Sequence, residues 1–144
     1  MCLESKRLFP RTALTDIVVG KLLCLTYNNE VVTYYQRYPV RNLEMKEKFS
    51  LFTILKMFIE KRRHKDLYYT LKGGMIHSYN LGNRDYFERQ RFETGITEYN
   101  DMYVKAIIPK GALYYKDCYD STYASNILIL KPTEEQLKYF KCNG

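Results

Sequence analysis

The chain has 144 residues, a formal net charge of +7, fifteen tyrosines and no tryptophan. Its length predicts a single domain over residues 1–144, which can bury a core without the help of disulfides or metals. Hydrophobic residues make up 46% of the chain and charged residues 27%, so the composition is that of a folded globular protein and excludes a disordered tail.

The first half of the chain predicts one hairpin and one helix. Residues 1–15 form an entry segment, and strands at 16–27 and 30–38 pair around the turn signal Asn28-Asn29. Residues 45–63 are predicted to be helical, because Phe49, Phe52 and Ile59 recur at helical spacing within an apolar stripe.

The second half predicts short strands and a C-terminal helix. The predicted strands cover residues 66–71, 75–79, 102–108, 112–115 and 123–130, and residues 80–91 are a polar helix or a long loop. Lys110-Gly111 is a predicted tight turn. The short connections favour antiparallel pairing. The fold class is therefore α+β, with a mostly antiparallel sheet, one central basic helix and a C-terminal helix.

The C-terminal helix is predicted from its first residues. Thr133 and Gln136 have the spacing of a capping box, in which each side chain bonds the backbone N–H of the other residue. Leu137 and Phe140 are expected to face the core, and Asn143-Gly144 to end the helix.

The positive charge is concentrated in the first half. Residues 1–74 hold 14 Lys and Arg and 7 Asp and Glu, whereas residues 75–144 hold 9 of each kind. Such a cluster can bind nucleic acid or an acidic macromolecular partner, or it can be a solvated helix end whose cations oppose the helix dipole. The predicted partner-binding residues are Lys61, Arg62, Arg63 and Lys65.

The sequence favours a non-catalytic protein over an enzyme. It contains neither of the common glycine-rich phosphate motifs, and His77 and Ser78 are neighbours that point to opposite faces of an extended strand. The four cysteines form no CxxC pair and only two histidines are present, so we expect free thiols and no metal or cofactor. We predict no catalytic residue.

Secretion and membrane insertion are not predicted. The N-terminal residues hold no apolar stretch typical of a secretory signal, and no apolar run approaches the roughly 18 residues of a membrane helix. We therefore expect a cytoplasmic protein without a membrane partner.

Tyrosine rings and cations together suggest a surface that binds a nucleotide or a nucleic acid. The segment 73–79 supplies two glycines that let a ligand approach the backbone, followed by an imidazole, a hydroxyl and a phenol. The alternative is a glycine turn that enters a strand whose histidine bonds a buried carbonyl. The predicted ligand-binding residues are His77, Ser78, Tyr79, Arg84, Lys110, Tyr114 and Tyr115.

Several short motifs resemble those of a known group of proteins. Three elements resemble those of uncharacterised small proteins of gut Bacteroidetes and their phages. They are a His-Ser-Tyr element preceded by glycine, the run Ile108-Pro109-Lys110-Gly111 with Tyr114-Tyr115, and Tyr123-Ala124-Ser125. The resemblance spans most of the chain. It implies a phage setting, and hence the host cell cytoplasm, but no activity by itself.

A second resemblance concerns the same turn. Pro109-Lys110-Gly111 is similar to the late hairpin of ADP-ribosyltransferase exoenzymes, but the strand after it lacks the glutamate of that family. This resemblance implies a shared fold at most.

Four functional hypotheses follow. The first is a non-catalytic phage accessory protein that binds an anionic nucleotide ligand, as an anti-defence sponge for a cyclic nucleotide or a related immune signal. The second is an inhibitor that contacts a host protein or nucleic acid through its basic helix end. The third is an ADP-ribosyltransferase-like enzyme. In the fourth, the tyrosines are ordinary strand residues or form a homo-oligomer interface.

Overall fold

The computed structural model describes residues 2–72, 74–95, 97, 98 and 100–141. The helices are α1 (Leu51–His64), α2 (Tyr86–Thr94) and α3 (Glu134–Lys141), with a short 3-10 helix η1 (Leu81–Asn83). The strands are β1 (Cys2–Ser5), β2 (Arg11–Thr12), β3 (Ile17–Leu25), β4 (Val31–Thr33), β5 (Glu44–Lys46), β6 (Tyr69–Lys72), β7 (Ile76–Tyr79), β8 (Thr97–Glu98), β9 (Asp101–Ile108), β10 (Leu113–Lys116), β11 (Thr122–Ser125) and β12 (Ile127–Lys131).

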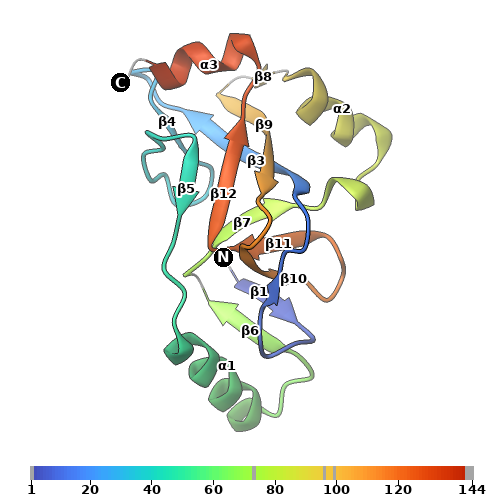
Figure 1. Ribbon diagram of the computed structural model, residues 1–144. Coiled ribbons are helices and arrows are strands. Elements are labelled where there is room, and N and C mark those ends of the chain that lie inside the picture. Colours follow the sequence, from blue (N-terminus) through green and yellow to red (C-terminus); the bar gives the residue numbers. More distant parts are fainter. Residues whose placement is uncertain (1, 73, 96, 99, 142–144) are drawn as a thin grey trace.

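Antiparallel sheets organise the molecule. The larger sheet has the strand order β2-β10-β11-β7-β3-β9-β12-β5, with β4 on β3 and β8 on β9. β1 and β6 pair separately and lie with α1 at one end of the molecule, whereas α2 and α3 lie toward the other end (Figure 1). Every strand pair within the described residues is antiparallel, so the predicted α+β class is confirmed.

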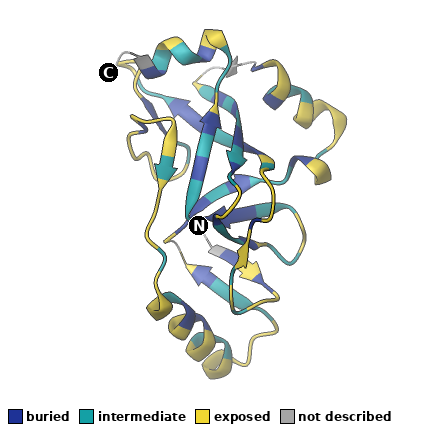
Figure 2. Cartoon of the chain, viewed as in Figure 1, coloured by how far each residue is buried: buried dark blue, intermediate teal, exposed yellow. Residues whose placement is uncertain are grey.

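The main core follows the alternation of β9. Met102, Val104, Ala106 and Ile108 have no exposed surface, whereas the residues between them are partly exposed. This period of two places one face of β9 on the core. Figure 2 shows the buried residues concentrated on the central strands. A smaller core, formed by residues that include Leu3, Leu71 and Tyr115, lies beside α1.

The helix predicted over residues 45–63 begins later than expected. Residues 44–46 form β5, in which Met45 pairs with Leu128 of β12, and Ser50 precedes α1 with an extended backbone. Pairing with β12 therefore overrides the helical spacing of the residues before Leu51. The prediction was wrong for this first part of the segment.

The predicted strand over residues 123–130 is two strands. Asn126 separates β11 from β12, its side-chain oxygen accepts a hydrogen bond from the Leu113 backbone N–H at 2.9 Å, and its own N–H donates to the Leu113 carbonyl at 3.1 Å. These bonds hold the bend that lets β11 join β7 and β10 while β12 joins β9 and β5.

The hairpin prediction is correct for its first part. β3 and β4 pair as expected, but β4 ends at Thr33, where the chain turns back with a hydrogen bond of 3.0 Å from the Arg37 N–H to the Thr33 carbonyl. Arg37 has a φ of 57°, which no regular strand residue adopts. The predicted entry segment also contains the strands β1 and β2, because both find partners that lie far away in the sequence.

The C-terminal prediction is confirmed where the structure describes it. The Thr133 N–H donates to the Gln136 side chain at 3.1 Å, and the Gln136 N–H donates to the Thr133 hydroxyl at 3.2 Å, which is the expected capping box. Phe140 is buried and Leu137 is half-buried. The expected end at residues 143–144 lies outside the described residues.

Candidate functional site

A pocket opens beside an interrupted edge of β3. On the edge opposite β9, β7 pairs with β3 only at Gly20, and β4 pairs with it from Leu23 to Leu25. Lys21 and Leu22 lie between these two partners and line a pocket of about 290 Å³. The segment 33–47, which connects β4 to β5, supplies much of the remaining wall. The volume is close to the lower end of the range for small-molecule sites.

Four tyrosines line this pocket. Tyr34, Tyr35 and Tyr38 come from the turn after β4, and Tyr79 comes from the end of β7. The rings of Tyr34 and Tyr35 meet edge to face with centroids 5.0 Å apart. Burial, followed by a side-chain hydrogen bond with Tyr35, raises the pKa of Tyr79 to about 12. The Tyr79 hydroxyl therefore stays protonated at neutral pH.

Lys21 contributes a half-buried cation to the pocket wall. Its ammonium donates a hydrogen bond of 2.7 Å to the backbone carbonyl of His77. Burial lowers the pKa of Lys21 from 10.5 to about 8, so the side chain still carries its charge in most molecules at pH 7. Within the described ranges no carboxylate forms an ion pair with it. An anion in the pocket would supply the missing opposite charge.

Three buried side-chain polar atoms have no hydrogen-bond partner among the described residues: the His77 Nε2, the Ser78 Oγ and the Arg84 Nε. Burial and the neighbouring charge of Lys21 lower the pKa of His77 to about 4, so its ring is neutral at pH 7. Buried polar atoms without partners are uncommon, because each one loses its hydrogen bond to water. His77 and Ser78 both line the pocket, but the protein covers these two atoms, and neighbouring residues of a strand point to opposite faces.

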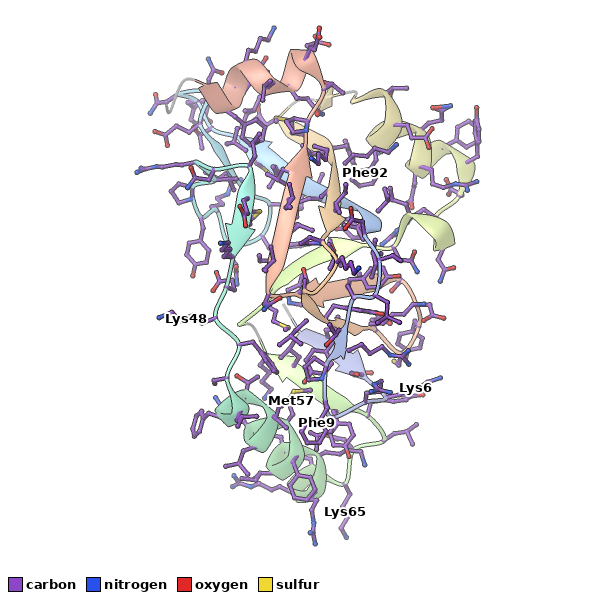
Figure 3. All side chains as sticks on the ribbon, in the orientation of Figure 1. Lys6, Phe9, Lys48, Met57, Lys65 and Phe92 are labelled. Atoms are coloured by element: carbon purple, nitrogen blue, oxygen red, sulfur yellow. The ribbon has the colours of Figure 1, made fainter. Side chains whose placement is uncertain are left out.

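Arg84 packs against Tyr79 without lining the pocket. Its guanidinium lies 4.4 Å from the centroid of the Tyr79 ring and donates to the Ser121 carbonyl at 3.3 Å. The ring of Phe92, which projects from α2 toward the sheet, has its centroid 6.1 Å from that of Tyr79 (Figure 3). These contacts pack the Tyr79 ring, which lines the pocket, between Arg84 and Phe92.

The structure divides the predicted ligand-binding residues among several places. His77, Ser78 and Tyr79 line the pocket, and Arg84 supports it. Tyr114 and Tyr115 instead line a second pocket of about 90 Å³. The division arises because β11 lies between β7 and β10 in the sheet.

Lys110 lies in neither pocket. It belongs to the exposed turn between β9 and β10, where its backbone N–H donates to the Asp16 side chain at 2.9 Å. The turn itself is present as predicted, with Gly111 at a φ of 92°.

The second pocket is lined by basic residues from the first half of the chain and by tyrosines from the second half. Arg11 of β2 is the cross-strand partner of Tyr114, and Lys6 and Arg7 also line this pocket. The Tyr115 hydroxyl donates to the Leu8 carbonyl at 2.7 Å, which ties the basic N-terminal segment to β10.

Sequence reasoning missed Lys21 and the tyrosines of the 33–47 segment. Lys21 is the single charged residue in the apolar run from Ile17 to Leu25, and a cation in such a run is a signal of a buried site. Tyr34, Tyr35 and Tyr38 were assigned to a regular strand, which hid the fact that they follow β4 in a turn and line the pocket.

Comparisons with known protein families, curated proteins and solved structures found no match. The motif resemblances therefore stay predictions. No cluster of His, Cys, Asp and Glu in the described part of the chain could hold a metal ion, and none of the described helices is long and apolar enough to cross a membrane.

The predicted partner-binding residues lie away from the pocket, at the C-terminal end of α1. The Lys61 ammonium lies 5.1 Å from the centroid of the Tyr69 ring. Lys65 ends the helix in the left-handed conformation, and its N–H donates to the Arg62 carbonyl at 3.4 Å. Arg62, Arg63 and Lys65 are exposed. This cluster therefore forms a separate basic surface.

Proposed function

We propose that the protein is a non-catalytic binder of a small anionic ligand of the nucleotide class, held in the tyrosine-lined pocket. The observation that carries this proposal is the Lys21 ammonium, which belongs to a half-buried side chain of the pocket wall and is bonded only to the His77 carbonyl among the described residues. A buried charge without a counter-charge destabilises the empty protein. A ligand phosphate beside Lys21 would remove that cost, and the binding free energy would include the gain.

The rest of the pocket suits the remaining parts of a nucleotide. Four tyrosine rings offer faces and edges on which a base can stack, with typical gains of about 1–3 kcal/mol per stacked base. The volume of about 290 Å³ suits a mononucleotide, or one unit of a larger signalling nucleotide, better than a nucleic acid strand.

Charges at the rim largely cancel, so Lys21 dominates recognition of the anion. Arg41 and Lys46 line the pocket together with Glu44 and Glu47, and the Lys46 ammonium lies 3.3 Å from the Glu44 carboxylate. This balance favours a ligand with a few phosphate charges over a highly charged polymer.

The biological role that we propose is sequestration of an immune-signalling nucleotide during phage infection. Its support is the resemblance of the short motifs to phage proteins, together with a pocket in which no activated nucleophile was identified among the described residues. A sequestering protein needs affinity and a slow release of its ligand, and it needs no chemistry.

Calorimetry with a panel of mononucleotides, cyclic dinucleotides and trinucleotides, and ADP-ribose tests this function. We expect one member to bind with a stoichiometry of one per pocket, and we expect Lys21→Met to weaken its binding at least tenfold. Lys131→Met is the matched control, because Lys131 is an exposed strand lysine outside the pocket. Absence of heat with every ligand, or equal affinity of the Lys21 variant, would contradict the proposal.

An activity assay separates binding from catalysis. Incubation of the protein with NAD should leave the dinucleotide intact and transfer no label to protein acceptors. Cleavage of NAD would refute the non-catalytic part of the proposal and support the ADP-ribosyltransferase-like alternative.

A further inference from the structure

α1 exposes an apolar face that no other described part of the chain covers. Ile54 and Met57 are buried, and Met57 belongs to the smaller core. The large apolar residues on the rest of the helix are between 39% and 78% exposed. These exposed residues are Leu51, Phe52, Leu55, Phe58 and Ile59.

The exposed residues form one continuous stripe along the helix. At 100° per residue, they span an arc of about 120° on the side of α1 turned away from Ile54 and Met57. Leu67, just after the helix, is 78% exposed as well. A continuous exposed apolar patch commonly marks a contact surface.

Cations lie beside the apolar stripe. We call the stripe and these cations together the α1 face. The Lys56 ammonium lies 5.9 Å from the centroid of the Phe52 ring, and the Arg62 guanidinium lies 5.8 Å from that of Phe58. Arg63 is also exposed. The single carboxylate of α1 is that of Glu60, which lies 3.0 Å from the His64 ring. The α1 face therefore combines apolar side chains with positive charge, and the one carboxylate of the helix lies beside it, next to His64.

The position of α1 leaves this face open to a large, flat partner. The helix lies at one end of the molecule, where it packs on β6 (Figure 1). Lys48 and Lys65 lie near its two ends and point away from the body (Figure 3). A planar surface can therefore approach α1 without meeting the larger sheet.

We propose that the α1 face docks the protein onto an anionic lipid surface. The apolar side chains would enter the boundary between headgroups and acyl chains, as in interfacial amphipathic helices. Lys56, Arg62 and Arg63 would extend their stems beside them and place their charges at the anionic headgroups. The helix lies in the plane of the membrane and does not span it.

Charge disfavours a second copy of the chain as the occupant. An isologous contact would bring two α1 faces together, and neither face carries a carboxylate that could pair with the cations of the other. An anionic bilayer supplies an apolar layer and negative charge together, and it needs no matching shape. This docking departs from the expectation of no membrane partner and is independent of the ligand in the pocket.

Cosedimentation with lipid vesicles tests the docking. The full chain is mixed with phosphatidylcholine vesicles, or with vesicles in which about a third of the lipid is phosphatidylglycerol. We expect binding to the anionic vesicles, weaker binding to the neutral ones, and a loss of affinity when salt is raised. Failure of the wild-type protein to bind anionic vesicles at low salt would overturn the proposal.

Substitutions of exposed residues distinguish vesicle binding through the α1 face from nonspecific adsorption to lipid. We expect the double variant Leu55→Gln/Phe58→Gln to bind anionic vesicles at least tenfold more weakly, whereas Leu14→Gln, at an 83% exposed leucine outside α1, binds as the wild type does. Arg62→Ala/Arg63→Ala should lose about fivefold per cation removed, and Arg89→Ala on α2 should lose nothing.

Two outcomes of these variants would refute the docking. One is vesicle binding that survives the Leu55 and Phe58 substitutions while circular dichroism shows a folded protein. The other is a dimer in analytical ultracentrifugation that the same substitutions dissociate, which would assign the α1 face to a second copy. Neither outcome bears on the proposal of nucleotide binding, because no residue of α1 lines the pocket.

Discussion

Replacing Lys21 by methionine should make the protein more stable and unable to bind its ligand. Methionine is one atom shorter than lysine, fills most of the same space and removes the charge. The pKa of Lys21 falls from 10.5 to about 8 on folding, which corresponds to a cost of about 3 kcal/mol for the half-buried lysine at pH 7. The substitution also removes the hydrogen bond to the His77 carbonyl, worth about 1 kcal/mol. A net gain of about 2 kcal/mol remains.

The stability difference between Lys21→Met and the wild type should depend on pH in one direction. Between about pH 8 and pH 10.5 the unfolded chain holds a proton on Lys21 that the folded protein has released, so the wild type gains stability as the pH rises through this window. The advantage of Lys21→Met is therefore complete below about pH 8 and disappears toward pH 10.5. Above this window the lost hydrogen bond should leave the variant slightly less stable.

Urea unfolding at pH 7 and pH 10 measures the effect. Lys131→Met serves as the control, because an exposed lysine should change the free energy of unfolding by no more than about 0.5 kcal/mol. If Lys21→Met destabilises the protein at pH 7, the ammonium is not an uncompensated charge, and the argument for an anion beside it fails.

Three further predictions concern the site and its support. The ring of His77 should titrate near pH 4 in an NMR titration and at a higher pH in Lys21→Met, because the charge of Lys21 contributes to the shift; an unchanged value would refute this coupling. Gly20→Ala should destabilise the protein by about 1–3 kcal/mol in urea unfolding, since the added carbon would lie 2.6 Å from the Phe92 ring; no change would mean that α2 moves away freely. Gln136→Leu removes hydrogen bonds to two backbone carbonyls, one of them at 2.7 Å, and should lower the melting temperature by several degrees; a melting temperature equal to that of the wild type would contradict the role of this buried amide.

Local patterns in the sequence predicted the elements whose stability is local. The capping box at Thr133 is confirmed because its two hydrogen bonds join residues only three apart. The turn at Gly111 and the start of the β3–β4 hairpin depend on nearby backbone angles in the same way.

Elements with distant partners escaped prediction. β5 and β2 are short and become strands only because β12 and β10 lie beside them in the sheet. The break at Asn126 likewise depends on hydrogen bonds to Leu113. No local periodicity carries this information, because the partners are far apart in the sequence.

The candidate site shows the same limit. Its β7 wall could be predicted from the local combination of an imidazole, a hydroxyl and a phenol. The opposite wall could not, because it depends on the gap that β7 and β4 leave along the edge of β3. That gap places Lys21 against His77 across 56 positions of sequence.

The titration of the Lys21 ammonium with and without ligand tests the central claim most directly. In protein labelled with ¹⁵N at lysine, NMR should show a pKa of about 8 for Lys21 in the empty pocket, and a value that moves up toward 10.5 when the tightest-binding nucleotide of the panel is added. An unchanged pKa of Lys21 at saturating nucleotide, or a panel in which no nucleotide binds, would contradict an anion-binding pocket at this position.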